Sequence, residues 1–414
     1  MNWPEVAVRR VVECLDGRRV PLNREQRSLM PGEVPYWGAG GVIDYVNEAI
    51  FDEPLVLVGE DGAPFFETGK DVSHYIEGPA WINNHIHALS AVGCDPKFLS
   101  YALNSVDYGY YITGATRDKL TQDDLKRIYI PSPPLEEQRR IADFLDAETS
   151  RIDSLSAHRR AQIELLQERF STEISELLTP GLADLSDRSE RWPWLPSTLQ
   201  TIRLGYLARV QTGVTVHNAR ESTEDSKEYP YLRVANVQGE HIDLSEIKTI
   251  RISPAMAQST TLQPGDVVTT EANGNPDNLG RGAVWQGEIP GMVHQNHVFA
   301  IRVDRSKLMP EYVSALLASI HGRRYFRFTS TQVGIATTSS SKVLDFPIPI
   351  RSLRSQNYVV NACESARRYR DSLSGALTNQ LSLLAERRQA LITAAVTGQF
   401  DVTTASGRNI TQGV

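Results

Sequence analysis

The histidines are the side chains in this sequence best suited to bind a metal, and their spacing does not complete a metal site. In His85-Ile86-His87 the two imidazoles are two residues apart, so a β-strand would place both on one face. His294 and His297 would lie on opposite faces of a strand. No cysteine or carboxylate stands at a spacing that would complete a zinc shell beside either pair. We therefore expect no metal site.

Enzyme motifs are missing as well. The nearest approach to a phosphate-binding P-loop, Gly62 to Asp71, has six residues between its glycines and an aspartate where a hydroxyl is required. The glycines of Gly38 to Gly41 are better interpreted as a turn than as a dinucleotide-binding loop. Asp225 with Glu246-Ile247-Lys248 weakly resembles a nuclease cluster, but this pattern is common by chance. We therefore expect no catalytic residues and a chain that is not an enzyme.

Segments rich in hydrogen-bond donors are the better candidates for a binding site. Cations alternate with rings from Arg323 to Arg327, and a hydroxyl-rich run, expected to be a glycine-containing loop, continues to Lys342. Thr113 to Lys119 is a shorter counterpart in the first half. These donor types contact phosphates and base edges of DNA, although a solvated polar loop remains the alternative for any single residue. The candidate DNA-binding residues are Asn83, Asn84, His85, Thr116, Arg117, Lys119, Asn296, His297, Arg323, Arg324, Arg327, Thr337, Thr338, Ser340 and Lys342.

The overall composition indicates the class of protein that carries these segments. The chain has 414 residues, of which 41% are hydrophobic and 22% charged, which is typical of a folded protein of two or three domains. No apolar run approaches the ~18 residues of a membrane span, and the N-terminus lacks the layout of a signal peptide, so a cytoplasmic location is expected. The net charge of −7 is unevenly distributed along the chain. Residues 1–135 carry 12 Lys and Arg against 19 Asp and Glu, whereas residues 351–414 carry 8 against 4. DNA binding is therefore not excluded.

An internal repeat organises the chain. At one constant offset in the numbering, Ile130-Pro131 matches Ile348-Pro349, Gln138 matches Gln356, and the register continues to Thr179 and Thr397. N-terminal to these tails, the two halves are similar only in short segments, and the offset differs from one segment to the next. Each half is therefore a divergent globular part followed by a more similar tail.

Each tail is predicted to be a long amphipathic helix, because apolar residues recur at three- and four-residue steps. Pro133 and Pro134 suit the first turn of the first helix. Two rods of this length predict a paired coiled coil, although each could instead cover only its own domain. In the globular parts, short helices are predicted at Pro96 to Leu103 and at Pro310 to Ile320.

The expected fold class is α+β. Its parts are a mixed α/β domain at 1–132, a central helix at 133–180, a linker at 181–194, a second mixed domain at 195–350, a C-terminal helix at 351–400 and a flexible tail at 401–414.

Several motifs, found together in this order, resemble those of type I restriction-modification specificity subunits. Ile130 to Asp153 (IPSPPLEEQRRIADFLDAETSRID) and Arg388 to Val402 (RQALITAAVTGQFDV) are similar to the helix signatures of that family. Tyr36 to Val46, Val58 to Ala63 and Trp81 to Leu89 are similar to one type of its target-recognition domain. The second helix departs from the pattern, because Arg351 to Gln356 replaces the usual proline-rich, acidic opening.

The resemblance implies two target-recognition domains separated by antiparallel spacer helices in a pseudo-twofold arrangement, each domain reading one half of a bipartite, asymmetric site in double-stranded DNA. It implies two modification subunits as partners, which carry S-adenosylmethionine and methylate adenine, and restriction motor subunits that use ATP and magnesium. No cofactor and no membrane is then expected for this chain itself. The alternatives are a helical protein-interaction scaffold that reads no DNA and, less favoured because enzyme motifs are missing, a free-standing nuclease or methyltransferase.

Overall fold

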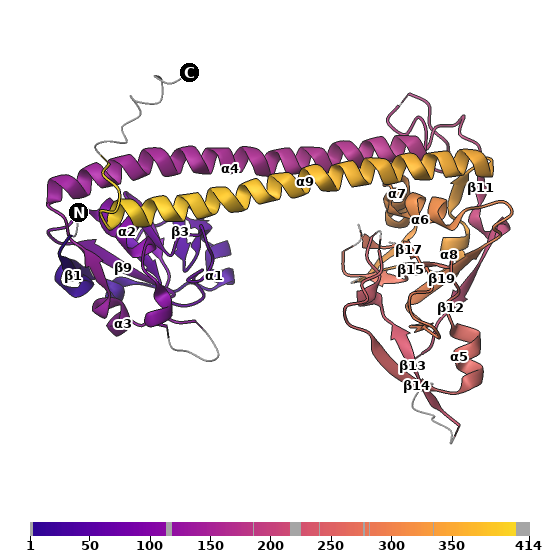
Figure 1. The fold of residues 1–414 in the computed structure, drawn as a ribbon, viewed down its shortest axis with the longest axis horizontal. Helices are drawn as coiled ribbons and strands as arrows, with labels where there is room; N and C mark the ends of the chain where they lie inside the picture. Colours follow the sequence, from indigo (N-terminus) through magenta and orange to yellow (C-terminus); the bar gives the residue numbers. More distant parts are fainter. Residues whose placement is uncertain are drawn as a thin grey trace. The chain divides into compact units, whose positions relative to one another are not determined.

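The computed structural model describes residues 3–112, 118–184, 186–215, 225–239, 241–275, 278–280, 282–333 and 335–402 (Figure 1). Of the segments predicted above, residues 113–117, which include Thr116 and Arg117, and residues 403–414 of the tail lie outside the described residues. The chain divides into two compact units: unit 1 holds residues 1–162 and 376–414, and unit 2 holds residues 163–375. Among the described helices, none combines the length and the hydropathy needed to cross a bilayer.

Unit 1 contains two β-sheets. One is antiparallel, in the order β2-β9-β6-β7, and the other has the order β4-β3-β8-β5, with β3 and β8 parallel. A short antiparallel pair, β1 and β10, leads into the first long helix. The elements are β1 (Glu5–Ala7), η1 (Val8–Arg10), β2 (Val12–Cys14), η2 (Asp16–Arg18), α1 (Arg24–Ser28), β3 (Pro31–Gly38), β4 (Gly41–Val46), β5 (Phe51–Asp52), β6 (Leu55–Gly59), β7 (Ser73–Ile76), β8 (Pro79–Ile82), β9 (Ile86–Ala91), α2 (Pro96–Asn104), η3 (Tyr108–Tyr110), α3 (Gln122–Arg127) and β10 (Tyr129–Pro131).

Unit 2 repeats this topology. Its antiparallel sheet has the order β12-β19-β15-β17, and its second sheet has the order β14-β13-β18, with β13 and β18 parallel. A small third sheet, β16-β21-β20, is an addition of this unit. The elements are β11 (Thr201–Arg203), η4 (Leu204–Tyr206), β12 (Ala208–Thr212), β13 (Lys227–Leu232), η5 (Val234–Asn236), β14 (Lys248–Ile252), α5 (Pro254–Thr260), β15 (Val267–Thr270), β16 (Ala272–Asn273), β17 (Gly282–Val284), β18 (Val293–His294), β19 (Val298–Val303), α6 (Pro310–Ala318), α7 (Ile320–Thr329), β20 (Thr331–Val333), β21 (Ile335–Thr337), α8 (Ser340–Leu344) and β22 (Pro347–Pro349).

The two predicted long helices are present. They are α4 (Leu135–Leu178) and α9 (Leu353–Val396), each 44 residues long, and both of their ends stand at the offset of the sequence repeat. In unit 1 the first turns of α4 share a core with the last turns of α9, through Ile141, Leu145 and Ile392. In unit 2 the last turns of α4 share a core with the first turns of α9, through Leu178 and Val359. Within each unit, then, the start of one helix packs beside the end of the other.

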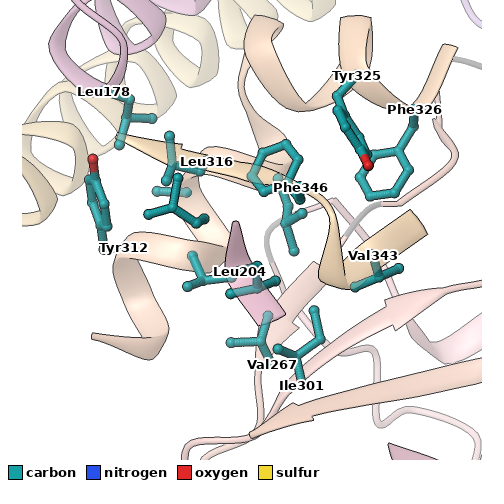
Figure 2. Close-up of a cluster of buried hydrophobic side chains, with 14 of the residues drawn as sticks. Leu178, Leu204, Val267, Ile301, Tyr312, Leu316, Tyr325, Phe326, Val343 and Phe346 are labelled. Carbon is teal, nitrogen blue, oxygen red and sulfur yellow. The ribbon is translucent and has the colours of Figure 1, made fainter. Parts of the chain in front are cut away.

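The core of unit 2 joins α4 to the globular part (Figure 2). Leu178, at the end of α4, lies with Tyr312 and Leu316 of α6, and all three are almost wholly buried. Tyr325 and Phe326 of α7 are likewise buried in this cluster. Burial of such side chains contributes roughly 1.5–3 kcal/mol each, so the end of the helix is an integral part of the domain core.

Two predictions about the second half need correction. Pro310 to Ile320 is not one helix, because the chain turns at Ser319, whose extended backbone (ψ 172°) ends α6 and whose hydroxyl caps α7 through the N–H of Gly322. The basic run Arg323 to Arg327 is therefore helical. The run from Thr329 to Lys342 is also not a loop, because it contains the β20–β21 pair and the short helix α8.

A buried glutamine ties α4 to its unit. The side-chain oxygen of Gln138 accepts a hydrogen bond from the backbone N–H of Asp95, the N-cap of α2, at 2.8 Å. Its amide nitrogen donates to the carbonyl of Pro133 at 2.9 Å. Only 3% of Gln138 is exposed, so both groups would lack partners if this amide were removed.

The repeat places a second glutamine at the same position of α9. The oxygen of Gln356 accepts from the N–H of Met309, the N-cap of α6, at 2.9 Å. Its nitrogen donates to the carbonyls of Lys307 and Arg351 at 2.9 and 3.0 Å. The match of Gln138 with Gln356 therefore has a structural cause: each amide fixes its long helix against the helix of its own domain.

We predict that Gln138→Ala and Gln356→Ala each lower the free energy of unfolding by about 2–4 kcal/mol, because each leaves buried backbone groups unpaired. Urea unfolding measures the cost, and hydrogen exchange should show faster exchange only in the unit that carries the change. Gln162→Ala is the matched control, since Gln162 is exposed on α4. A cost at Gln138 no larger than that at Gln162 would contradict the structural role.

Candidate nucleic-acid interface

In unit 1 the predicted residues Asn83, Asn84 and His85 form the connection between β8 and β9, at the end of the central strand β6. The carbonyl of His85 accepts a hydrogen bond from the N–H of Glu60 at 2.9 Å. Glu60 in turn forms an ion pair with Lys119 at 3.2 Å. The structure thus brings Lys119 to the asparagine–histidine connection, and we call Glu60, Asn83, Asn84, His85 and Lys119 the unit 1 strand-end cluster.

The two histidines of this segment do not share a face. His85 precedes β9, has a side chain that is 46% exposed, and lies 3.4 Å from the carboxylate of Asp61. His87 is 1% exposed. The prediction that a strand places both imidazoles on one face is wrong, because the strand begins only at Ile86.

His87 anchors a charged network behind the cluster. Its Nδ1 lies 2.7 Å from Asp16 Oδ2, and its Nε2 lies 3.0 Å from the carbonyl oxygen of Leu120. Arg19 also contacts this network, 2.8 Å from Glu60 and 3.4 Å from Asp16. Burial tends to raise the pKa of Asp16, but the hydrogen bond and charge of His87, the N–H of Ala88 and the charge of Arg19 together lower it to about 2.

Asp16, Glu60 and His87 also bring three potential metal ligands within 4.8 Å of one another. Sequence spacing did not indicate this group, because its members come from three separate segments. Both ring nitrogens of His87 have protein partners, and Glu60 has two cationic partners, Arg19 and Lys119. The group therefore acts as an ion-pair network that connects η2, β6 and the residues after Lys119.

Unit 2 has the equivalent strand-end position. The N–H of Glu271, at the end of β15, donates to the carbonyl of His297 at 2.9 Å, as Glu60 does to His85. Here the side chains pair directly, with Nδ1 of His297 2.7 Å from the Glu271 carboxylate. Asn296 stands beside the ring, with its Nδ2 3.4 Å from His297 Nε2. The carbonyl of Glu271 accepts from the N–H of Thr338, so the hydroxyl-rich run reaches the same place.

We call Glu271, Asn296, His297, Thr337 and Thr338 the unit 2 strand-end cluster. Thr337 joins it because it pairs with Ala272 in the β16–β21 ladder. Thr338 is buried, whereas His297 is exposed.

The remaining predicted residues of unit 2 lie on α7 and α8. Ser340 and Lys342 belong to α8, and the Lys342 ammonium lies 3.4 Å from the hydroxyl of Thr331 in the adjoining β20–β21 pair. Arg324 and Arg327 are exposed on α7. Arg323 points elsewhere, because its guanidinium donates to the Ser171 hydroxyl of α4 at 2.8 Å.

The residues that sequence reasoning missed are the acidic ones, Asp16, Glu60 and Glu271. A signal for two of them was present, because Glu60 and Glu271 stand at almost the same offset in the numbering as His85 and His297. Of the weakly proposed nuclease group, Glu246 is exposed and pairs with Arg233 and Lys248, at 3.4 and 3.8 Å.

Comparisons with known proteins agree with one another. Residues 2–165 match the family model of the type I restriction modification DNA specificity domain. A putative type I restriction enzyme specificity subunit of Haemophilus influenzae is 32% identical over 141 residues, which are 34% of this chain and 36% of that protein. The EcoKI specificity subunit of Escherichia coli K12 is 24% identical over 295 residues, which are 69% and 61% of the two chains. The chain thus spans less than two thirds of the length of either relative.

The fold also matches that of a solved structure. A chain in a study of complex assembly and conformational transition of the type I restriction-modification system superposes with a TM-score of 0.67 and 15% identity, covering 96% of this chain and 98% of that one. At this identity the similarity concerns the fold alone.

The network around Asp16 predicts a pH dependence of stability. The pKa of Asp16 is lowered from 3.8 to about 2, so its contribution is fully present above about pH 4 and is lost as the pH falls towards 2. We expect Asp16→Asn to cost about 1–2 kcal/mol at pH 6, a range discounted for partial solvent exposure, and the difference from wild type to shrink below pH 4. Urea unfolding at several pH values measures it. Asp52→Asn, at an exposed site, is the control, and a difference that does not change with pH would contradict the role of Asp16.

Proposed function

Because the chain belongs to the family of type I restriction-modification specificity subunits, we propose that it is the subunit that recognises DNA in such a system and that each unit reads one half of a bipartite, asymmetric site. One observation carries this proposal. The two units share a topology and a strand-end set of Glu, Asn and His, yet the side chains beside that set differ, Lys119 in unit 1 and Thr337 and Thr338 in unit 2. Two copies of one fold that present different hydrogen-bonding side chains are suited to two different half-sites.

The chemistry of the strand-end clusters supports contact with bases and phosphates. In unit 1, the side chains of Asn84, His85 and Lys119 are exposed and carry donors and acceptors that suit base edges or a phosphate. In unit 2, exposed His297 and half-buried Thr337 do the same. Glu60 orients the Lys119 ammonium and Glu271 orients the His297 imidazole, since a carboxylate itself would repel a phosphate.

Arg324, Arg327 and Lys342 would add phosphate contacts in unit 2, and Thr338 and Ser340 would help to position them. The net charge of −7 is low for a protein that binds DNA by itself. We propose that partner subunits supply much of the phosphate-binding surface, which makes affinity for DNA a property of the assembled complex.

The long helices are proposed to dock two modification subunits and to set the distance between the half-sites. Leu155 and Leu383 in unit 1 and Leu165 in unit 2 are 47%, 63% and 64% exposed on α4 and α9. Leu155 and Leu383 line one shared groove, and a contiguous apolar surface favours contact with another protein. S-adenosylmethionine would then be carried by the modification subunits, and ATP and magnesium by the motor subunits.

The same leucines favour a second candidate function, a helical scaffold that assembles partners and reads no DNA. Salt dependence separates the two functions. A DNA-reading complex loses affinity for DNA steeply as salt rises, because phosphate contacts release counterions. A scaffold would show no sequence-specific DNA binding at any salt concentration.

We predict that paired variants at equivalent positions act on different half-sites. Asn84→Ala with His85→Ala should weaken binding to one half-site, and Asn296→Ala with His297→Ala should weaken binding to the other, by ~1–3 kcal/mol for each base contact removed. The measurement is the Kd of the complex with its modification subunits for duplexes substituted one base pair at a time. His158→Ala, an exposed histidine on α4, is the control. If both pairs of changes affected the same half-site, the division between the units would be wrong.

We also predict that the helices act as a ruler. Four residues inserted after Arg160 in α4 and four after Thr378, the matching position of α9, lengthen each helix by about 6 Å and turn the helix beyond the insertion by only some 40° from its original register. The methylated site should keep both half-sites and gain one or two base pairs between them, because DNA rises ~3.4 Å per base pair.

Sequencing of methylated adenines in cells that carry the lengthened subunit gives the result. A single-helix insertion after Arg160 is the control and should reduce methylation, since it lengthens only one of the two helices. A folded, active subunit with both insertions and an unchanged gap would show that another part of the complex sets the distance.

A further inference from the structure

One tyrosine of unit 1 projects from the surface of the domain. Tyr110, the last residue of η3, is 82% exposed, which is the largest exposed fraction among the large hydrophobic side chains described. A single exposed ring is common on protein surfaces and needs no explanation by itself. The backbone that carries this ring and its position beside the strand-end cluster, however, give it a possible role in binding.

The turn that carries Tyr110 is anchored on both sides. Two residues earlier, Tyr108 is 2% exposed, and its hydroxyl donates to the carbonyl of Leu103 at 3.0 Å. Two residues later, Ile112 is 9% exposed and belongs to the same hydrophobic core. The N–H groups of Tyr111 and Ile112 both donate to the carbonyl of Tyr108, each at 3.0 Å. The Tyr110 ring is thus held out into solvent by a closed turn, so its backbone would lose little freedom on binding.

The same turn is tied to the unit 1 strand-end cluster. The Tyr108 ring packs against the Phe65 ring, with 5.2 Å between the centroids, and Phe65 lies five residues after Glu60 of the cluster. The chain that follows η3 returns to the cluster at Lys119, which pairs with Glu60 at 3.2 Å. Both segments that meet at the Phe65–Tyr108 contact therefore lead to the residues proposed to read DNA.

The corresponding ring of unit 2 has a contact within the protein. At the offset of the internal repeat, Tyr110 corresponds to Phe328, which is 61% exposed. The Phe328 ring packs edge to face on Trp194 of the linker, with 5.4 Å between the centroids. Among the described residues no aromatic ring packs on Tyr110. Packing therefore accounts for the ring in unit 2 but not for the ring in unit 1.

We propose that Tyr110 inserts its ring between two base pairs at the edge of the half-site read by unit 1. This inference rests on the proposed function, because it takes the strand-end cluster to lie against DNA. Continuity with that cluster favours DNA over a protein as the partner of the ring. An aromatic ring stacks on any base, and a tyrosine loses little side-chain entropy when it does so. Insertion of such a ring partly unstacks the two base pairs and kinks the duplex.

Insertion would add sequence selectivity without a hydrogen bond to a base. Pyrimidine–purine steps such as TA and CA/TG unstack most easily, so the deformation of the duplex costs least at these steps. Tyr110 would then determine the preferred step at the edge of the half-site, while Asn84 and His85 contact base edges within it.

The test compares Tyr110→Ala with wild type in the complex with its modification subunits. We expect the affinity for a duplex that carries the recognised site to fall about five- to 150-fold, because stacking on one base is lost. The slope of log K against log salt should not change, because no charge is removed. Tyr110→Phe keeps the ring and should bind as wild type does. Tyr129→Ala is the matched control, since it removes a tyrosine of β10 that is 53% exposed.

A chemical probe of stacking tests insertion directly. Permanganate oxidises unstacked thymines, so thymine is placed in turn at each position flanking the half-site. Wild type and Tyr110→Phe should make the thymine at one step reactive, and Tyr110→Ala should not. Circular dichroism confirms that each variant is folded.

The inference is overturned if Tyr110→Ala binds DNA within twofold of wild type, if its permanganate pattern equals that of wild type, or if Tyr129→Ala weakens binding as much. The paired change Asn84→Ala with His85→Ala separates this failure from a failure of the proposed function. If the pair weakens binding to one half-site and Tyr110→Ala does not, the cluster reads DNA and only the insertion is wrong. If neither change affects DNA binding, unit 1 does not read DNA and both proposals are wrong.

Discussion

The attachment of each globular domain to the ends of two long helices depends on a buried glutamine amide. Apolar side chains such as Leu145 and Val359 supply most of the buried surface. Apolar contacts are not directional, however, and would tolerate a helix shifted along its axis. The amides of Gln138 and Gln356 fix the direction, because each must meet the N-cap N–H of a domain helix and a carbonyl beside its own helix start. The positions of the strand-end clusters relative to the helix of the same unit depend on this register.

The two units share this attachment but differ in the charged groups at their strand-end clusters. Unit 1 places a partly buried network of Asp16, Arg19 and His87 behind its strand-end cluster, and this network holds the chain after Lys119. Unit 2 pairs half-buried Glu271 with exposed His297 and adds a third sheet whose strands bring threonines to the same place. One platform therefore presents different neighbouring side chains in each half.

The sequence predicted the long helices within a few residues, because a period of three to four apolar residues over 44 positions is a strong local signal and the internal repeat reproduces it. It did not predict the acidic partners Asp16 and Glu60, since His87 meets them through strand pairing and chain crossings between segments far apart in the sequence. It also did not predict that the Arg323 guanidinium meets Ser171 of α4, which is far away in the sequence. Neighbouring residues on a helix point to different sides. The sides of α7 could not be assigned from the sequence, because its start depends on the break in the helix at Ser319.

Exchange of one globular domain is the most direct test of independent reading by the two units. Residues 201–349, from β11 to β22, would be replaced by the corresponding segment of another specificity subunit, leaving α4 and α9 intact. Methylated adenines would then be sequenced in cells that carry the hybrid and its modification subunits. Independent reading predicts a site in which one half changes, while the other half and the gap between them are kept. A hybrid that is folded and active but methylates a site changed in both halves would contradict it.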